Sequence, residues 1–140
     1  MRKIIIILIL IFVTGCVSNE DFKKVCTYEN KSNNLIDKTV MTIYYDGDDI
    51  VKDVSVVRNF KTDDVTILDS IKKASLIYVN RYGNKNISIF VSKNLNDEYE
   101  LKYEFDARKV NENILNDFNI RKNKVKMFQR FKKIGIECEG

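Results

Sequence analysis

The clearest pattern in the chain is a strict alternation of apolar and charged positions between residues 98 and 106, where the sequence reads EYELKYEFD. A period of two predicts a β-strand with one face on a hydrophobic core and the other face in water. The apolar face holds Tyr99, Leu101, Tyr103 and Phe105. The charged face holds Glu98, Glu100, Lys102 and Glu104. We interpret the charged face as a solvated surface, because paired catalytic carboxylates need a cleft between them and a strand face offers none.

Four further segments have strand character, being rich in β-branched and aromatic side chains. They cover residues 22–29, 38–46, 50–60 and a stretch from residue 86 onward. Asp46-Gly47 is a strong signal for a tight hairpin. The aspartates around it are interpreted as a charged hairpin tip, because the glycine and glutamate positions of a calcium-binding loop hold Val51 and Val57. The predicted core face of the third segment holds Ile50, Val54, Val56 and Phe60, and it is interrupted by Lys52 and Arg58.

Three segments have the periodicity of helices. The longest begins at about Asp63, after a capping threonine, and ends at about Arg81, just before a glycine. Shorter helices are predicted over residues 110–118 and 123–134. The order strand-strand-strand-helix-strand-strand-helix-helix predicts an α+β fold, in which an antiparallel sheet of about five strands has its helices packed on one face. Residues 22–140 are expected to form a single domain.

The amino terminus, MRKIIIILILIFVTGC, has a charged start, about ten apolar residues and small residues before Cys16. The apolar run is too short for a transmembrane helix, which needs about 20 residues. The pattern predicts a secretory signal over residues 1–15. Cys16 at its end resembles the lipidated cysteine of the bacterial lipobox, although an ordinary signal with a chance cysteine is the alternative. We therefore expect a protein anchored through acylated Cys16 and the tether 16–21 to the extracytoplasmic face of the cell membrane.

Two cysteines remain after acylation, Cys26 near the start of the mature domain and Cys138 near its end. Outside the cytoplasm such a pair is expected to form a disulfide. Two unrelated reduced cysteines are the alternative.

The amino-acid composition excludes two common kinds of enzyme active site. The chain has no histidine, which removes the Ser-His-Asp and Cys-His arrangements and the commonest metal ligand. No metal and no cofactor are expected, and the protein is expected not to be an enzyme. Of 24 cations, Arg2 and Lys3 leave with the signal, so 22 remain against 20 acidic groups. That near balance does not favour nucleic acid as a partner.

Several of these features together resemble the YehR-like lipoproteins, a family of small lipoproteins of low-GC Gram-positive bacteria. They are the lipobox, Cys26-Thr27, the hairpin, the helix opened by Asp63-Asp64, the strand at 99–106 and the closing Gly135-Ile136-Glu137-Cys138. That family has no agreed activity, so the resemblance assigns no catalytic residue.

Two sets of residues are candidate contact sites. The first is a basic run on the last helix, in which Lys124, Lys126 and Arg130 are predicted to touch an anionic surface, with a docked helix and a solvated basic face as the alternative. The second is the set of strand aromatics, which form either core or a ligand groove. Its members are Tyr28, Tyr44, Tyr45, Tyr99, Tyr103 and Phe105.

The leading functional expectation is a non-enzymatic envelope lipoprotein that binds a protein or envelope partner. The alternatives are a lipoprotein that binds a small ligand through the sheet aromatics and an immunity or exclusion lipoprotein. A concave pocket favours the ligand reading, and a flat sheet with an exposed apolar patch favours the partner reading.

Overall fold

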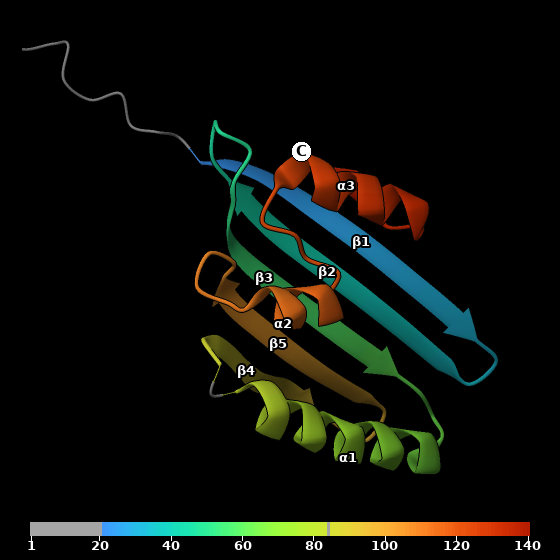
Figure 1. The fold of residues 1–140 in the computed structure, drawn as a ribbon. Coiled ribbons are helices and arrows are strands. Elements are labelled where there is room, and N and C mark those ends of the chain that lie inside the picture. The colour runs from blue at the N-terminus through green and yellow to red at the C-terminus, as the bar shows by residue number, and fades with distance from the viewer. Residues whose placement is uncertain (1–20, 84) are drawn as a thin grey trace, which may run out of the picture.

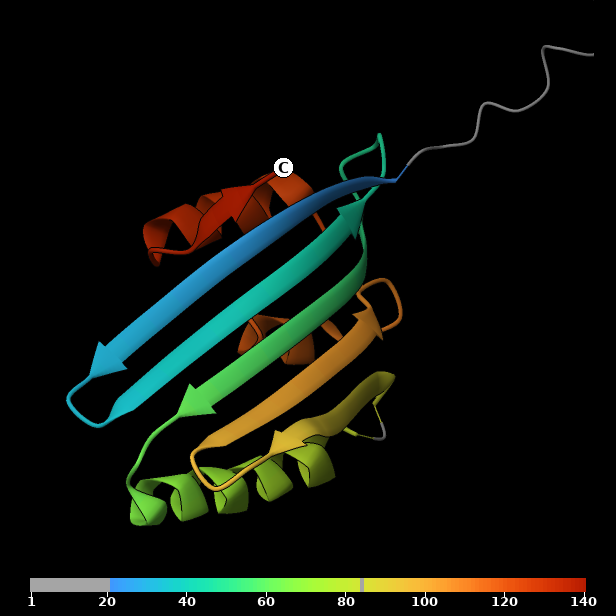
Figure 2. The same ribbon diagram turned by 180° about the vertical axis from the view of Figure 1, so that it is seen from behind.

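The computed structural model describes residues 21–83 and 85–140. They form one six-stranded antiparallel sheet in the order β4-β5-β3-β2-β1-β6, with three helices on one face (Figure 1). Within the part of the chain that the structure describes, the other face of the sheet carries no helix (Figure 2). The predicted α+β class is confirmed, with one strand more than the expected five. The strands are β1 (Phe22–Ser32), β2 (Leu35–Tyr45), β3 (Val51–Lys61), β4 (Ile87–Asn94), β5 (Glu98–Asp106) and β6 (Glu137–Glu139); the helices are α1 (Val65–Tyr82), α2 (Glu112–Asp117) and α3 (Lys124–Lys133).

Strand β5 has the two faces that its alternation predicts. Its apolar side chains Tyr99, Leu101, Tyr103 and Phe105 are all buried. On the opposite face the Asn59 amide donates to Glu98 at 2.6 Å and to Glu100 at 2.9 Å. These carboxylates therefore belong to a polar surface network on the bare face of the sheet.

The hairpin between β2 and β3 turns at the predicted aspartates. Oδ1 of Asp46 accepts hydrogen bonds from the backbone N–H groups of Asp48 and Ile50. The prediction that Ile50 lies on the core face is wrong, because its side chain is 42% exposed and Val51 is fully buried instead. The register of β2 and β3 shifts between Ile43 and Tyr45, and such an irregularity changes which residues face the core.

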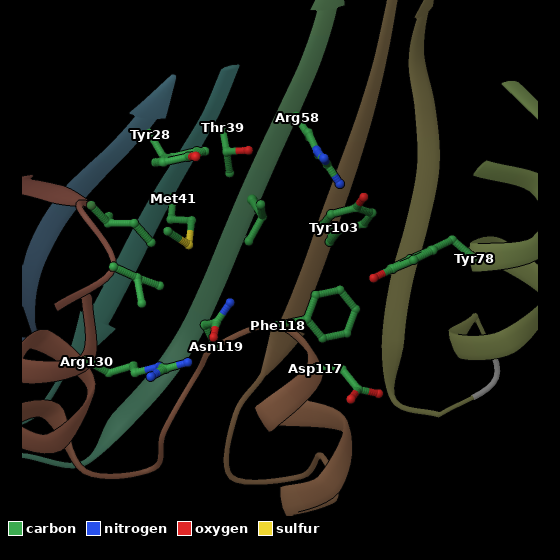
Figure 3. A pocket seen from close by; sticks show the side chains of 13 residues that line it. Tyr28, Thr39, Met41, Arg58, Tyr78, Tyr103, Asp117, Phe118, Asn119 and Arg130 are labelled. Atoms are coloured by element: carbon green, nitrogen blue, oxygen red, sulfur yellow. The ribbon is translucent and has the colours of Figure 1, made fainter. Parts of the chain in front are cut away.

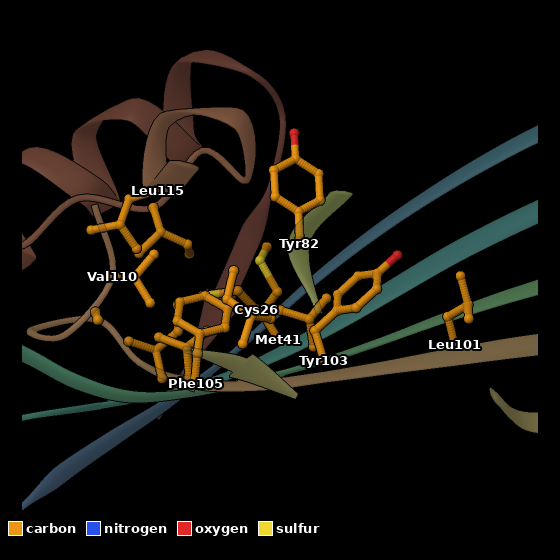
Figure 4. Packing of buried hydrophobic residues seen from close by; sticks show 14 of the residues in the cluster. Cys26, Met41, Tyr82, Leu101, Tyr103, Phe105, Val110 and Leu115 are labelled. Atoms are coloured by element: carbon orange, nitrogen blue, oxygen red, sulfur yellow. The ribbon is translucent and has the colours of Figure 1, made fainter. Parts of the chain in front are cut away.

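Each helix is held against the sheet by an apolar stripe. α1 begins after Asp64, whose carboxylate accepts from the backbone N–H groups of the first turn, and it packs over β4 and β5. Figure 4 shows the side chain of Leu115, from α2, above that of Phe105 on the sheet. In α3, Met127 and Phe131 are fully buried. The core side chains of the described residues extend from Cys26 to Phe131.

The sixth strand is formed by the last residues of the chain. Gly135, at φ +81°, ends α3, and the N–H of Ile136 donates back to the Phe131 carbonyl at 2.9 Å. This turn returns the chain to the free edge of β1, where Cys138 lies directly opposite Cys26. Their Sγ atoms are 2.07 Å apart, in a disulfide, and their Cα atoms are 4.0 Å apart.

Candidate functional site

A cleft of about 420 Å³ opens over the middle of the sheet, between α3 on one side and α1 with the end of α2 on the other (Figure 3). Its floor comes from strands β1, β2, β3 and β5, and its walls come from the three helices and the segments that follow α2 and α3. The lining residues are Tyr28, Thr39, Met41, Val56, Arg58, Tyr78, Tyr103, Asp117, Phe118, Asn119, Arg130, Ile134 and Ile136.

Much of this cleft is apolar. Met41 and Val56 form part of its floor and are buried. Phe118 forms part of one wall, and its ring packs against those of Tyr78, Tyr82 and Tyr103 at centroid distances of 6.1, 5.2 and 5.6 Å. Aromatic pairs at these distances stabilise one another beyond simple burial. The wall is therefore held in place by contacts within the protein itself.

Arg58 brings a cation onto the helix-covered face of β3, at one of the two positions that interrupt its apolar pattern. Its guanidinium donates to both carboxylate oxygens of Asp37 on β2, with Nε–Oδ1 at 3.1 Å and Nη2–Oδ2 at 2.7 Å. The Phe60 ring lies beneath it, 4.8 Å from the guanidinium carbon. The hydrogen bonds to Asp37 raise the pKa of Arg58 further above its already high ordinary value. Arg58 is thus a permanent cation whose charge is compensated by its neighbour.

The side chain of Tyr103 brings a neutral hydroxyl group to the cleft. Burial raises the pKa of Tyr103 to about 12, because the phenolate would lose its hydration. Figure 3 shows the hydroxyl group of Tyr103 turned toward Arg58. Tyr103 therefore stays protonated at neutral pH and adds no negative charge to the site.

Asp117 is the carboxylate of the lining, and a neighbouring tyrosine engages it. The hydroxyl of Tyr82 donates to Oδ2 of Asp117 at 2.7 Å. This bond raises the pKa of Tyr82, because its ionisation would place a second negative charge beside the carboxylate. Asn119 follows two residues later in a left-handed conformation, with φ at +59°.

Arg130 enters from the opposite side, on α3. Figure 3 shows its guanidinium extending from the helix toward Asn119. Within residues 21–83 and 85–140, Arg130 takes part in no ion pair and no side-chain hydrogen bond. It is a cation facing the cleft with its charge uncompensated.

The structure separates the three cations predicted to touch an anionic surface. Lys124 pairs with Asp49 at 2.8 Å and lies over the Tyr45 ring. Lys126 is exposed, and Arg130 lines the cleft. Contact with an anionic surface stays a prediction. Within the fold, Lys124 is already paired with Asp49, and Arg130 lies at the cleft. Cys16, the predicted lipidation site, lies outside the described residues.

The strand aromatics divide between core and cleft. Tyr45, Tyr99 and Phe105 are buried in the core, and Tyr28 lines the cleft. Tyr103 belongs to both, since it is buried and also lines the cleft. Tyr44 lies on the bare face of the sheet, in a shallow hollow with Asp53 and Glu104. The groove reading therefore fits two of the six aromatics.

No group of three His, Cys, Asp or Glu side chains suited to a metal ion occurs in the described residues. In the same part of the chain, no helix is long and apolar enough to cross a bilayer.

No protein-family model matches the chain, and no curated protein is similar enough in sequence to match it. Among solved structures the chain is similar to one described as the NMR structure of the protein from Streptococcus pneumoniae TIGR4, with a TM-score of 0.53. The two share 11% sequence identity over 91% of this chain and 90% of the other. At that identity the likeness concerns the fold alone.

Proposed function

We propose that this protein is a lipid-anchored binding protein of the extracytoplasmic membrane face, and that its ligand occupies the cleft over the sheet. The anchor rests on the sequence from Arg2 to Cys16. The ligand site rests on one observation, the cleft of about 420 Å³ that combines apolar walls with charged and hydroxyl groups. Small-ligand sites are concave and mostly apolar, with a few placed polar groups, and span about 300–1,000 Å³.

The bare face of the sheet supports this reading over docking through a flat apolar surface. Its charged side chains pair with one another, with Lys102 to Glu104 at 2.8 Å and Lys93 to Glu98 at 3.1 Å. Phe90 is exposed on β4, but Lys102 lies 5.8 Å from its ring. Such a face is satisfied in water. The cleft instead leaves apolar side chains and a cation open to a ligand.

The test uses a matched pair of substitutions on β2. Thr39 lines the cleft, whereas Thr42 lies on the opposite face of the same strand. Thr39→Trp should fill the cleft, and Thr42→Trp should leave it open, while both place an aromatic residue in a strand that tolerates it. The protein used in this test is the secreted chain from residue 16 with Cys16→Ser, so it carries no acyl chains. It keeps every core residue that the structure describes. Circular dichroism and thermal melting verify that all versions are folded.

The probe is the dye anilinonaphthalenesulfonate, whose fluorescence rises in an apolar site. We expect one dye to bind each folded molecule, with at least about tenfold weaker binding to Thr39→Trp, equivalent to about 1.4 kcal/mol. Thr42→Trp should bind as the parent does. Equal binding to both variants, or no binding to the folded parent, would overturn the assignment of the cleft.

A further inference from the structure

We propose that the ligand of the cleft is a small amphipathic anion, with one anionic group held by Arg130 and an apolar body laid on the floor of the cleft. This inference rests on the proposed function, since it names the ligand class of the same site. It makes Arg130 the residue that selects ligands by charge.

The charges around the cleft favour an anion. Its lining holds two cations, Arg58 and Arg130, and one carboxylate, Asp117. Arg58 is compensated by Asp37. Asp117 keeps its negative charge, because the Tyr82 hydroxyl that it accepts is neutral, but it lies on the α1 and α2 side of the cleft, away from Arg130. Arg130 is the cation of the lining without an ion-pair partner among the described residues, so an anion is favoured on the α3 side.

The position of Arg130 suits recognition of one anionic group. A guanidinium presents a rigid fork of donors that matches the oxygens of a carboxylate or similar anion. Figure 3 places the Asn119 side chain beside it, and rotation of the amide would turn its N–H₂ group, a further donor, toward the same place. An anion between these two residues would lose its hydrogen bonds to water and gain charge-assisted hydrogen bonds from Arg130 and Asn119. These bonds offset the cost of its desolvation.

The rest of the lining calls for an apolar body. Met41 and Val56 form part of the floor, Phe118 forms part of one wall, and Ile134 and Ile136 form part of the α3 side. A ligand that is charged all over would cover these side chains without gaining from their burial. An aromatic ring or short hydrocarbon would remove the half-exposed ones, Phe118, Ile134 and Ile136, from water at about 25 cal/mol per Å² of apolar surface. The class is therefore anionic at one end and apolar elsewhere.

Two probes of nearly the same shape isolate the charge. Anilinonaphthalenesulfonate carries one sulfonate, and N-phenylnaphthylamine is its uncharged counterpart. Arg130→Gln should weaken binding of the sulfonate dye about tenfold, or about 1.4 kcal/mol, and leave binding of the neutral dye unchanged. The control is Lys126→Gln, which removes the same charge from the same helix at a position that is exposed, as Arg130 is, but does not line the cleft. It should change neither.

The outcomes separate this inference from the proposed function. If Thr39→Trp blocks both dyes but Arg130→Gln spares the sulfonate dye, the cleft binds ligands and the anionic class is wrong. The class is also wrong if Lys126→Gln weakens the sulfonate dye as much as Arg130→Gln, because general attraction then explains the effect. If neither dye responds to Thr39→Trp, the proposed function itself fails.

Discussion

Cys26 on β1 and Cys138 on β6 face each other across the edge of the sheet, and their disulfide fastens β6 to β1. The other end of α3 is held where Asn123 bridges to Ile50 beside the β2–β3 hairpin. The α3 side of the cleft, which carries Arg130, lies between these two attachments. The disulfide is therefore part of the support of the proposed site as well as of the fold.

Loss of the disulfide should destabilise the domain and weaken ligand binding. The bond closes a loop with a sequence separation of 112 residues. Removing a native disulfide from a small secreted domain costs about 2–5 kcal/mol. Cys26→Ser and Cys138→Ser should lower the free energy of unfolding equally, as measured by urea denaturation, and should also weaken binding of anilinonaphthalenesulfonate.

The double variant is the control for this prediction. It should be no less stable than either single variant, because all three lack the same cross-link. Mass spectrometry of the exported protein should find no free thiol at Cys26 or Cys138. Two free thiols, or single variants of very different stability, would contradict the prediction.

Replacing the partner of Arg58 should have two opposite effects. Asp37→Asn keeps the shape of the side chain but leaves the Arg58 charge uncompensated beside the cleft. The side chain of Arg58 is 41% exposed, so the loss of unfolding free energy should be moderate, about 1–2 kcal/mol. Binding of the sulfonate dye should become several-fold tighter. A matched control is Glu29→Gln, which breaks an exposed pair with Lys31 on the neighbouring strand β1 and should change neither quantity, because strand alternation turns both side chains to the opposite face of the sheet. Unchanged dye affinity in Asp37→Asn would count against an electrostatic preference of the cleft.

Much of the fold could be predicted from the sequence because its main elements carry strong local signals. Strand β5 alternates strictly, and α1 begins at a capping aspartate. Strand β6 was not predicted, since three residues show no periodicity and its position depends on pairing with β1 more than a hundred residues earlier. The error at Ile50 has a similar origin, because an irregularity between β2 and β3 shifts the register without a local sequence signal.

The cleft could be predicted only in part. Arg58 was visible as a cation that interrupts an apolar face, and Tyr28 and Tyr103 were among the candidate groove aromatics. Phe118, Asn119 and the cleft-facing side of α3 were not predicted, because their positions depend on how α2 and α3 dock on the sheet. Periodicity identifies which residues of a helix are buried, but it does not show what the remaining residues of that helix face.

The carboxyl group of Asp106 should give a pH dependence of known sign. The Arg108 guanidinium hydrogen-bonds to it at 2.8 and 2.7 Å and holds the pKa of Asp106 below its ordinary value. The folded pKa is then lower than the unfolded one, so the stabilisation is present above the ordinary value of about 3.9 and is lost as the pH falls through the folded value. In Arg108→Gln, NMR titration should find the pKa of Asp106 raised toward the ordinary value. Arg121→Gln, whose side chain donates to an asparagine instead, should leave it unchanged. A pKa of Asp106 that is the same in Arg108→Gln and the parent would refute the pairing.

The proposed anchor gives Cys16 a role that can be separated by experiment from that of the Cys26–Cys138 disulfide. If Cys16 is diacylated, cells fed a fatty-acid analogue should label the parent and Cys26→Ser but not Cys16→Ala. Two acyl chains give stable attachment where one is marginal, since each buried CH₂ contributes about 0.8 kcal/mol. Cys16→Ala should therefore either appear in the medium or accumulate unprocessed, with its cleft still able to bind the dye when purified. Label that persists in Cys16→Ala would contradict the anchor while leaving the cleft proposal intact, because the residues that line the cleft lie between Tyr28 and Ile136.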